Sequence, residues 1–364
     1  SSSSSSNEKK VTYSLNAYLR KVYGGSINER FLRKQLKIQV LAQKYLTQKT
    51  NDIAAGYDQA EIDKAYKDAT STYDFVTFRA YTFKTTELTK EDNETDAQLK
   101  ARQTKADAEV KKNANDFYNA VTNEATFAAK AKELNKETAD YNVDEETKYS
   151  MLQDSVKSAF SEDAAKWLFD SSTKAGSKKL FSDETNGKYI VVLAVKAPHQ
   201  EQTVTARHIL LSTKDQSTQK DLSEEEIAKK KTQAEDILKK FNEGDKSEDS
   251  FAALANEYTE DSGSSSNGGL YEHIYPGQMV TEFNDWCFDA NRKAGDVEMV
   301  KTDYGYHIIY FVAKDGKDYY DSAIRSSKAN DDIETETKKL QKSDDYKIGL
   351  GPRRTDYAEK RVLK

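Results

Sequence analysis

The sequence contains a single cysteine, Cys287, among 364 residues. One cysteine cannot form a disulfide within the chain, and it excludes a metal site built from several cysteines. Its two neighbours are aromatic, and its counterpart in an internal repeat is apolar, so we predict that Cys287 packs in a core rather than acting as a reactive thiol. Long hydrophobic runs are also absent, so no segment is expected to span a membrane.

The chain lacks an excess of charge of one sign. Its 56 basic and 62 acidic residues are interspersed without a basic stripe, which argues against a nucleic-acid partner. Aromatic residues are plentiful, with 22 Tyr and 14 Phe, so a wholly disordered chain is excluded. Apolar residues make up 36% and charged residues 32%. This balance favours long solvated helices, and the length predicts two or three domains.

The first residues predict a flexible segment. The chain begins with Ser1 rather than Met, and no hydrophobic signal region follows, so we interpret it as a processed product. Six serines followed by polar residues predict a tether over residues 1–10, because such a composition buries too little apolar surface to become ordered. A remnant added for expression is the alternative interpretation.

Helices are predicted at both ends of the chain. Residues 14–49 carry apolar side chains at three- and four-residue steps between Phe31 and Tyr45, with Ser26 or Asn28 as a candidate N-cap. A short helix is expected over 58–69. A polar helical pattern returns at 319–340, and an irregular tail follows from 349. We expect the helices before and after the intervening segments to pack into one domain.

An internal repeat occupies the middle of the chain. Val76-Thr77-Phe78-Arg79 recurs as Val204-Thr205-Ala206-Arg207, residues 127–134 recur as 251–258, and Trp167-Leu168-Phe169-Asp170 recurs as Trp286-Cys287-Phe288-Asp289. The closing segments 187–192 and 305–310 also align. Each unit is predicted to contain a strand, a long charged helix, a short helix, a helix with the tryptophan and two closing strands.

Histidine distinguishes the two units. Three of the four histidines lie in the second unit, and His208 and His307 align with Ala80 and Tyr189 of the first. The second unit alone has a glycine-rich stretch, residues 263–277. A lone histidine in a strand is usually a satisfied core residue, but two that are both missing from the sister copy indicate a functional site.

Five ordered segments of the second unit resemble a known family. They are Ala206-Arg207-His208-Ile209-Leu210-Leu211, residues 251–262, Asn267-Gly268-Gly269-Leu270-Tyr271, Gly277-Gln278-Met279-Val280 with Phe283, and residues 301–309. Together they are similar to the parvulin-type peptidyl-prolyl cis/trans isomerases over essentially all of 203–314. The surrounding architecture resembles the PrsA and SurA group of extracytoplasmic foldases.

This resemblance implies an α+β architecture in four parts. The expected parts are the tether (1–10), a helical chaperone domain (11–73 with 317–364), a degenerate parvulin-like module (74–199) and an active parvulin domain (203–315). The first module lacks both histidines and is expected to be inactive, retained for binding or spacing.

The resemblance also implies a site. Catalytic roles are expected for His208, His307, Asp261 and Thr302, and substrate binding for Leu270, Gln278, Met279 and Phe283. No metal or cofactor is expected, because rotation about an Xaa-Pro bond requires only an apolar slot and polar groups tuned to the twisted amide. The residues alone allow simpler interpretations: Met279 and Phe283 as helix core, and Asp261 as a turn residue.

The function implied is isomerisation and chaperoning of secreted proteins outside the cytoplasm. The partners would be unfolded clients with Xaa-Pro bonds, and the expected location is the outer face of a bacterial cell membrane, contacted only through an N-terminal lipid anchor. The segment 214–227 lacks the tight basic cluster that phosphate-directed parvulins need. A non-enzymatic holdase that uses the parvulin units for docking is the alternative, and a cell-surface adhesin is a weaker one.

Overall fold

The computed structural model describes residues 14–23, 28–139, 141–215 and 217–343. The expected tether, Ser26 as a cap and the tail from residue 349 lie outside these residues. The chain divides into two compact units. The terminal unit comprises Ser1–Glu61 with Ile324–Lys364, and the central unit comprises Ile62–Ala323.

Helices from both ends of the chain meet in the terminal unit. They are α1 (Leu15–Tyr23), α2 (Glu29–Gly56), the start of α3 (Gln59–Asp68) and most of α13 (Tyr319–Lys342). The Asn28 side chain accepts a hydrogen bond from the backbone N–H of Phe31 and begins α2, which agrees with one of its two predicted caps. Tyr57, just after α2, donates a hydrogen bond to Asp332 on α13 at 2.9 Å.

The apolar residues of α2 remain exposed. Phe31, Leu36, Val40, Leu41 and Tyr45 each keep between 46% and 68% of their surface accessible. The periodicity predicted the helix, but the described residues do not cover its apolar face. No helix among the described residues is long and apolar enough to cross a lipid bilayer.

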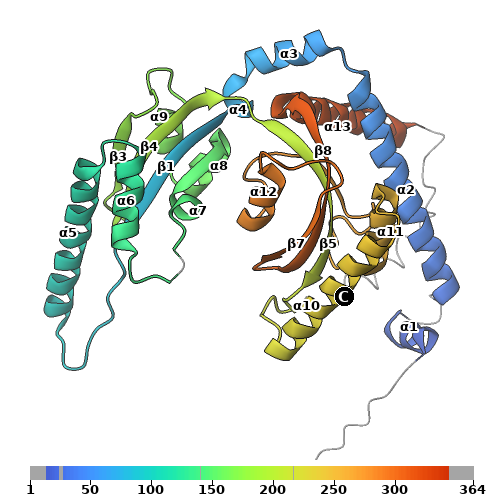
Figure 1. Cartoon of the computed structure of the whole chain (residues 1–364), viewed down its shortest axis with the longest axis horizontal. Helices are drawn as coiled ribbons and strands as arrows, with labels where there is room; N and C mark the ends of the chain where they lie inside the picture. The colour runs from blue at the N-terminus through green and yellow to red at the C-terminus, as the bar shows by residue number, and fades with distance from the viewer. Residues whose placement is uncertain (1–13, 24–27, 140, 216, 344–364) are drawn as a thin grey trace, which may run out of the picture. The chain divides into compact units, whose positions relative to one another are not determined.

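The central unit contains two four-stranded antiparallel sheets of the same strand order (Figure 1). The first half runs β2-β1-β4-β3 and the second half β6-β5-β8-β7. After α4 (Thr70–Tyr73), the first half contains β1 (Phe75–Lys84), α5 (Asp96–Ala120), α6 (Glu124–Leu134), α7 (Val143–Thr147), β2 (Lys148–Leu152), α8 (Gln153–Ala159), α9 (Glu162–Leu168), β3 (Lys178–Asp183) and β4 (Lys188–His199). The second half contains β5 (Gln202–Ser212), α10 (Glu224–Glu243), α11 (Glu248–Tyr258), β6 (Leu270–Ile274), α12 (Thr281–Phe288), β7 (Val297–Thr302) and β8 (Gly305–Asp318).

Helices cover both faces of each sheet (Figure 1). In the first half, α5 and α6 pack on one face, where Phe117 and Phe127 meet Val191, and α8 and α9 pack on the other. In the second half, α10 and α11 cover the face that carries Ile209, and α12 covers the face that carries Ala206. The alternation of side chains along each strand supplies both apolar faces.

One ion pair recurs in both halves. Arg79 of β1 bonds Glu124, and Arg207 of β5 bonds Glu248, at 3.2 and 2.9 Å. Each glutamate is the first residue of an 11-residue helix, α6 or α11. The two arginines therefore occupy equivalent positions. This equivalence determines which residue of the first sheet corresponds to each residue of the second.

Two details of the predicted repeat are wrong. Each half has a fourth strand, β2 or β6, at the edge of its sheet. The counterpart of His307 is Ile190 rather than Tyr189: Thr82 pairs with Ile190 as Leu210 pairs with His307. The sequence alignment was shifted by one residue at the last strand, and a shift of one residue exchanges the two faces of a strand.

Candidate active site

Two adjacent strands bring the histidines together. His208 lies on β5 and His307 on β8, and their partners across the ladder are Ile309 and Leu210. The two rings therefore point to the same face of the sheet, toward α12. They are only 4% and 6% exposed, and their Nδ1 atoms lie 3.1 Å apart.

The histidine pair belongs to a longer series of hydrogen bonds. Thr302, the last residue of β7, lies 2.9 Å from Nε2 of His307 through its Oγ1. At the other end, Nε2 of His208 lies 2.9 Å from Oδ2 of Asp261, in the turn after α11. The structure thus brings together all four residues for which a catalytic role was expected.

The chemistry of these atoms limits where the protons can lie. A carboxylate only accepts, so His208 donates its Nε2–H to Asp261. A neutral His208 then accepts at Nδ1 from the Nδ1–H of His307, which leaves Nε2 of His307 to accept from the Thr302 hydroxyl. Every polar atom of the series has a partner in this arrangement, as a buried network requires.

Asp261 is held as a carboxylate. Its Oδ2 accepts from His208, from the Ser264 hydroxyl at 2.5 Å and from the Tyr271 hydroxyl at 3.0 Å. The hydrogen bond from His208 is the main reason that the pKa of Asp261 lies far below its ordinary value, although burial opposes this shift. The site therefore contains a fixed negative charge next to an imidazole.

His307 is held neutral. Burial is the main cause that lowers its pKa to about 3, and the neighbouring His208 lowers it further. Burial and the charge of Asp261 raise the pKa of Tyr271 to about 12, so that its hydroxyl stays protonated and donates. The site thus combines one ionised carboxylate, Asp261, with an uncharged His307 and an uncharged Tyr271 hydroxyl.

Aromatic rings form the wall beside the histidines. Phe283 of α12 is 1% exposed and lies nearly perpendicular to both imidazoles, at centroid distances of 5.5 and 5.6 Å. Met279, just before α12, is partly buried against the same apolar cluster. Tyr271 completes the wall, 5.3 Å from the ring of His208.

Two of the expected substrate-binding residues are not brought into this wall. Leu270 pairs with Arg207, whose side chain bonds α11 on the opposite face of the sheet, so Leu270 faces away from Phe283. Gln278 is exposed, and its side chain accepts a hydrogen bond from the backbone N–H of Tyr275, which holds the turn before α12.

Sequence reasoning missed Tyr271 and Ser264. Tyr271 could have been found, because it lies beside Leu270 in the family motif and alternation places one of the two on each face. Ser264 is one of four serines within 262–266. No sequence signal separates it from the others.

Two glycines let the backbone approach the site. A Cβ on Gly269 would lie 2.2 Å from the carbonyl oxygen of His208, and a Cβ on Gly305 would lie 2.2 Å from that of Leu211. Both have positive φ, of 74° and 148°. Gly269 also accepts a hydrogen bond from the backbone N–H of His208. Gly269, in the glycine-rich stretch, thus helps to position the strand that carries the first histidine.

Comparisons with known proteins identify the family of this domain. Residues 189–315 match the family described as "PPIC-type PPIASE domain", so the chain carries a parvulin-type domain. Over 92 residues it is 42% identical to the foldase protein PrsA of Geobacillus sp. (strain WCH70), covering 25% of this chain and 31% of that protein. Over 186 residues it is 32% identical to a parvulin-like PPIase of Rickettsia bellii, covering 50% and 54%.

These matches are partial. The aligned part spans about a third or less of the PrsA relatives from Geobacillus and Bacillus cereus. Among solved structures, PrsA from Bacillus subtilis is 19% identical, with 89% of this chain and 91% of that chain covered and a TM-score of 0.28.

Proposed function

We propose that this protein is a parvulin-type peptidyl-prolyl cis/trans isomerase and chaperone that assists the folding of secreted proteins. The observation that carries the proposal is the unbroken hydrogen-bond series from Thr302 through the two histidines to Asp261, set against Phe283 in a domain of the matching family. The clients are unfolded polypeptides that contain Xaa-Pro bonds.

The chemistry of the site suits this reaction. Rotation about a peptide bond has a barrier of about 18–20 kcal/mol, and no covalent bond forms or breaks. The planar amide carries more negative charge on its oxygen than the twisted amide does. A fixed carboxylate near that oxygen therefore disfavours the planar form more than the transition state, which lowers the barrier. Asp261 is the group assigned this role.

The remaining residues position the substrate and the carboxylate. Phe283 and Met279 form the apolar slot for the proline ring, and we assign Tyr271 to its wall in place of Leu270. The histidine pair and Thr302 are positioning residues, because they orient Asp261 through hydrogen bonds. Gln278 acts at the rim by holding the turn that carries Met279.

The isomerase is tested with a short Xaa-Pro peptide and with proline-limited refolding of a second protein. We expect acceleration by the full chain, and a loss of about tenfold or more in His208→Ala and Met279→Ala. His273→Ala is the matched control, because His273 is exposed and lies outside the hydrogen-bond series. No acceleration at micromolar protein, or equal losses in all three variants, would rule out the proposed site.

We further infer that the central unit is a duplicated module in which only the second copy is active. The shared strand order and the recurring Arg–Glu pair support the duplication. Ala80 and Ile190 occupy the positions of the two histidines, so the first copy has no polar series. We retain the division into 74–199 and 203–315, with 11–73 and 317–364 as the helical chaperone domain.

The exposed apolar face of α2 supports the holdase alternative. Contiguous apolar surface usually marks a binding site, and a helix face of this kind could hold unfolded chains. Suppression of aggregation by the His208→Ala variant, at the same level as the unaltered chain, would show that holding is separate from isomerisation. Loss of both activities together would favour a single site.

For location, we propose the outer face of a bacterial cell membrane with an N-terminal lipid anchor. The relatives named PrsA foldase support a role in secretion. The upstream gene sequence tests the anchor: a signal peptide that ends in a lipid-attachment cysteine just before Ser1 is expected. A cytosolic start codon at that point would overturn the location.

A further inference from the structure

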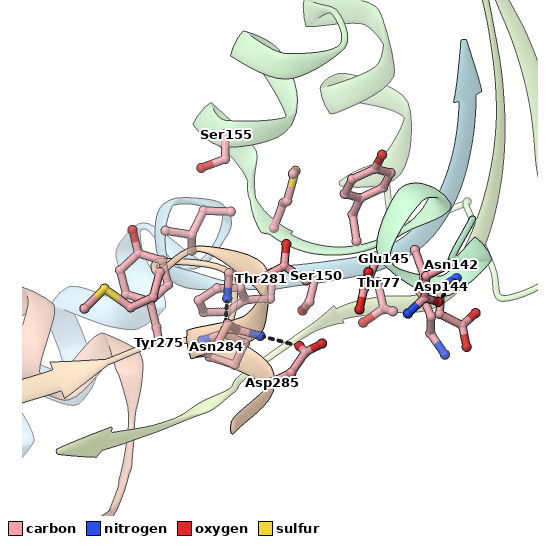
Figure 2. A pocket seen from close by; sticks show the side chains of 18 residues that line it. Thr77, Asn142, Asp144, Glu145, Ser150, Ser155, Tyr275, Thr281, Asn284 and Asp285 are labelled. Atoms are coloured by element: carbon pink, nitrogen blue, oxygen red, sulfur yellow. Dashed lines mark hydrogen bonds between the residues drawn. The ribbon is translucent and has the colours of Figure 1, made fainter. Parts of the chain in front are cut away.

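A cavity lies in the central unit, away from the histidines. It has a volume of about 610 Å³, within the range of about 300–1,000 Å³ that is usual for ligand sites. One wall comes from β1, α7, β2 and α8, and the other from the segment 275–285 that leads into α12 (Figure 2). Neither histidine of the proposed active site lines it, although Met279 does.

An edge strand forms part of this cavity. β2 is the outer strand of the first sheet and is hydrogen-bonded only to β1. Such a strand presents unpaired backbone N–H and C=O groups, which can pair with an added extended chain. The Ser150 hydroxyl of β2 also has no hydrogen-bond partner among the described residues, so this wall keeps unused hydrogen-bonding capacity.

The two walls contact each other without polar bonds. The ring of Phe75 meets that of Tyr275 at 5.8 Å, and Gly277 approaches the Ser150 carbonyl so closely that a Cβ there would lie 3.2 Å from its oxygen. Within the described residues, no hydrogen bond or ion pair links the segment 275–285 to β2. A chain bound along β2 would therefore displace the contact of Gly277 with the Ser150 carbonyl, but no hydrogen bond or ion pair between the walls.

Apolar side chains line both walls of the cavity. Tyr149 and Met151 of β2 line the cavity, and so do Tyr275 and Met279 of the other wall, which provides apolar surface on both sides. Alternating apolar side chains of an extended peptide would find contacts on these walls.

The cavity contains carboxylates that have no cationic partner among the described residues. Asp144 is paired with Arg79, and Lys148 is paired with Glu124. Glu145 and Asp285 also line it, and neither forms an ion pair within the described part of the chain. The carboxylates left without a cation therefore favour a basic group.

We propose that this cavity is a second polypeptide-binding site. Its occupant is an extended client segment that adds a strand to the edge of β2 and carries a lysine or arginine between apolar residues. No proline is required. The proposal extends the chaperone role and does not rest on isomerase activity. Because Met279 borders both sites, one client chain could engage them together, which would raise its effective concentration at the histidine site.

The test uses the full chain and two labelled heptapeptides without proline. Both alternate valine and threonine, and the central residue is lysine in one and glutamate in the other. Fluorescence anisotropy should show the lysine peptide binding about tenfold more tightly. Glu145→Gln with Asp285→Asn should reduce this preference to about threefold or less. The matched variant, Glu146→Gln with Glu282→Gln, changes neighbouring exposed carboxylates outside the cavity and should keep it.

Two further measurements locate the binding. Ser155 lies on α8 in the cavity wall and is exposed, so Ser155→Trp should obstruct the site and weaken binding about fivefold or more without changing Tm. A photo-crosslinker in the lysine peptide should label residues 142–155 and 275–285. Equal affinity for the two peptides, or labelling confined to α2, would overturn the proposal.

The isomerase assay separates this proposal from the proposed function. The Glu145→Gln/Asp285→Asn variant should isomerise Xaa-Pro peptides at the unaltered rate. Lysine-peptide binding in a chain that shows no isomerisation would leave the second site established and the enzymatic proposal refuted. Isomerisation without any preference for the lysine peptide would support the enzymatic proposal and refute the second site.

Discussion

The imidazole rings of His208 and His307 lie nearly parallel, with their centroids 5.3 Å apart and their Nδ1 atoms within hydrogen-bond distance. One proton lies between the two nitrogens, so one ring donates while the other accepts. The pair therefore behaves as a single unit, and a proton shift at one ring changes the hydrogen bonds of the other.

The charge of Asp261 should be essential. Asp261→Asn keeps the size of the side chain but removes the negative charge and leaves His208 with a weaker acceptor. We expect the rate of Xaa-Pro isomerisation to fall about tenfold or more, with the far-ultraviolet circular dichroism unchanged. A normal rate in this variant would remove Asp261 from the catalytic role.

The two faces of β6 can be distinguished by mutation. Tyr271→Phe keeps the ring beside His208 and removes only the hydroxyl that bonds Asp261, so a rate loss of a few fold is expected. Leu270→Ala should leave the isomerisation rate within about twofold, because its side chain faces away from Phe283. A larger loss of rate in Leu270→Ala than in Tyr271→Phe would indicate that Leu270 forms part of the apolar slot.

The neutral state of His307 predicts a dependence of stability on pH. Its pKa is about 3 in the folded protein, against an ordinary value of 6.5. Between these values the unfolded chain binds more protons, so the free energy of unfolding decreases as the pH falls below about 6.5. This contribution is fully present above about 6.5 and is lost progressively toward about 3.

A double variant isolates this contribution. His208→Ala with His307→Ile copies the apolar pair Ala80 and Ile190 of the first half. We expect its Tm to fall less than that of the unaltered protein between about pH 7.5 and about pH 4.5. The variant should also lose isomerase activity. Parallel decreases of Tm in the two proteins would contradict a buried neutral His307.

Gly269 lies so close to the His208 carbonyl that a side chain at this position should lower the free energy of unfolding. Gly269→Ala places a methyl group against the carbonyl of His208 at a positive φ, and about 2 kcal/mol or more of stability should be lost in urea unfolding. Gly295→Ala is the matched control, since Gly295 has a φ of 89° but open space around it. A similar loss in both variants would show that φ strain alone is responsible.

The single cysteine should be unreactive in the folded protein. Burial raises the pKa of the Cys287 thiol to about 12, and its side chain is inaccessible. A thiol reagent at about pH 8 should label it only as the protein unfolds in urea. Prompt labelling of the folded chain would contradict the packing role.

The elements with strong local signals could be predicted from the sequence. The period of α2, the cap at Asn28 and the aromatic, β-branched pattern of β1 are encoded in consecutive residues. A site at His208 and His307 was inferred from the sequence because the first unit lacks both histidines. The comparison within one chain supplied this signal.

The features that depend on strand register could not be predicted. β2 and β6 are five-residue edge strands, and β6 follows a glycine-rich turn, so neither has a clear period. The alignment of His307 with Tyr189 was wrong by one residue, because Ile190 is the counterpart. For Leu270, the prediction named the neighbour of Tyr271, the residue whose ring lies beside His208. A one-residue shift changes little in a sequence pattern but moves a side chain to the other face of the sheet.

Because the Arg–Glu pair recurs in both halves, the two sheets of one molecule can be compared with each other. Signals that arise from the shared framework, such as slow amide exchange in the central strands, should occur in duplicate, once from each sheet. Signals that arise from the buried pair of His208 and His307 should occur once. A spectrum of the intact chain could therefore separate the behaviour of the scaffold from that of the chemistry without any mutation.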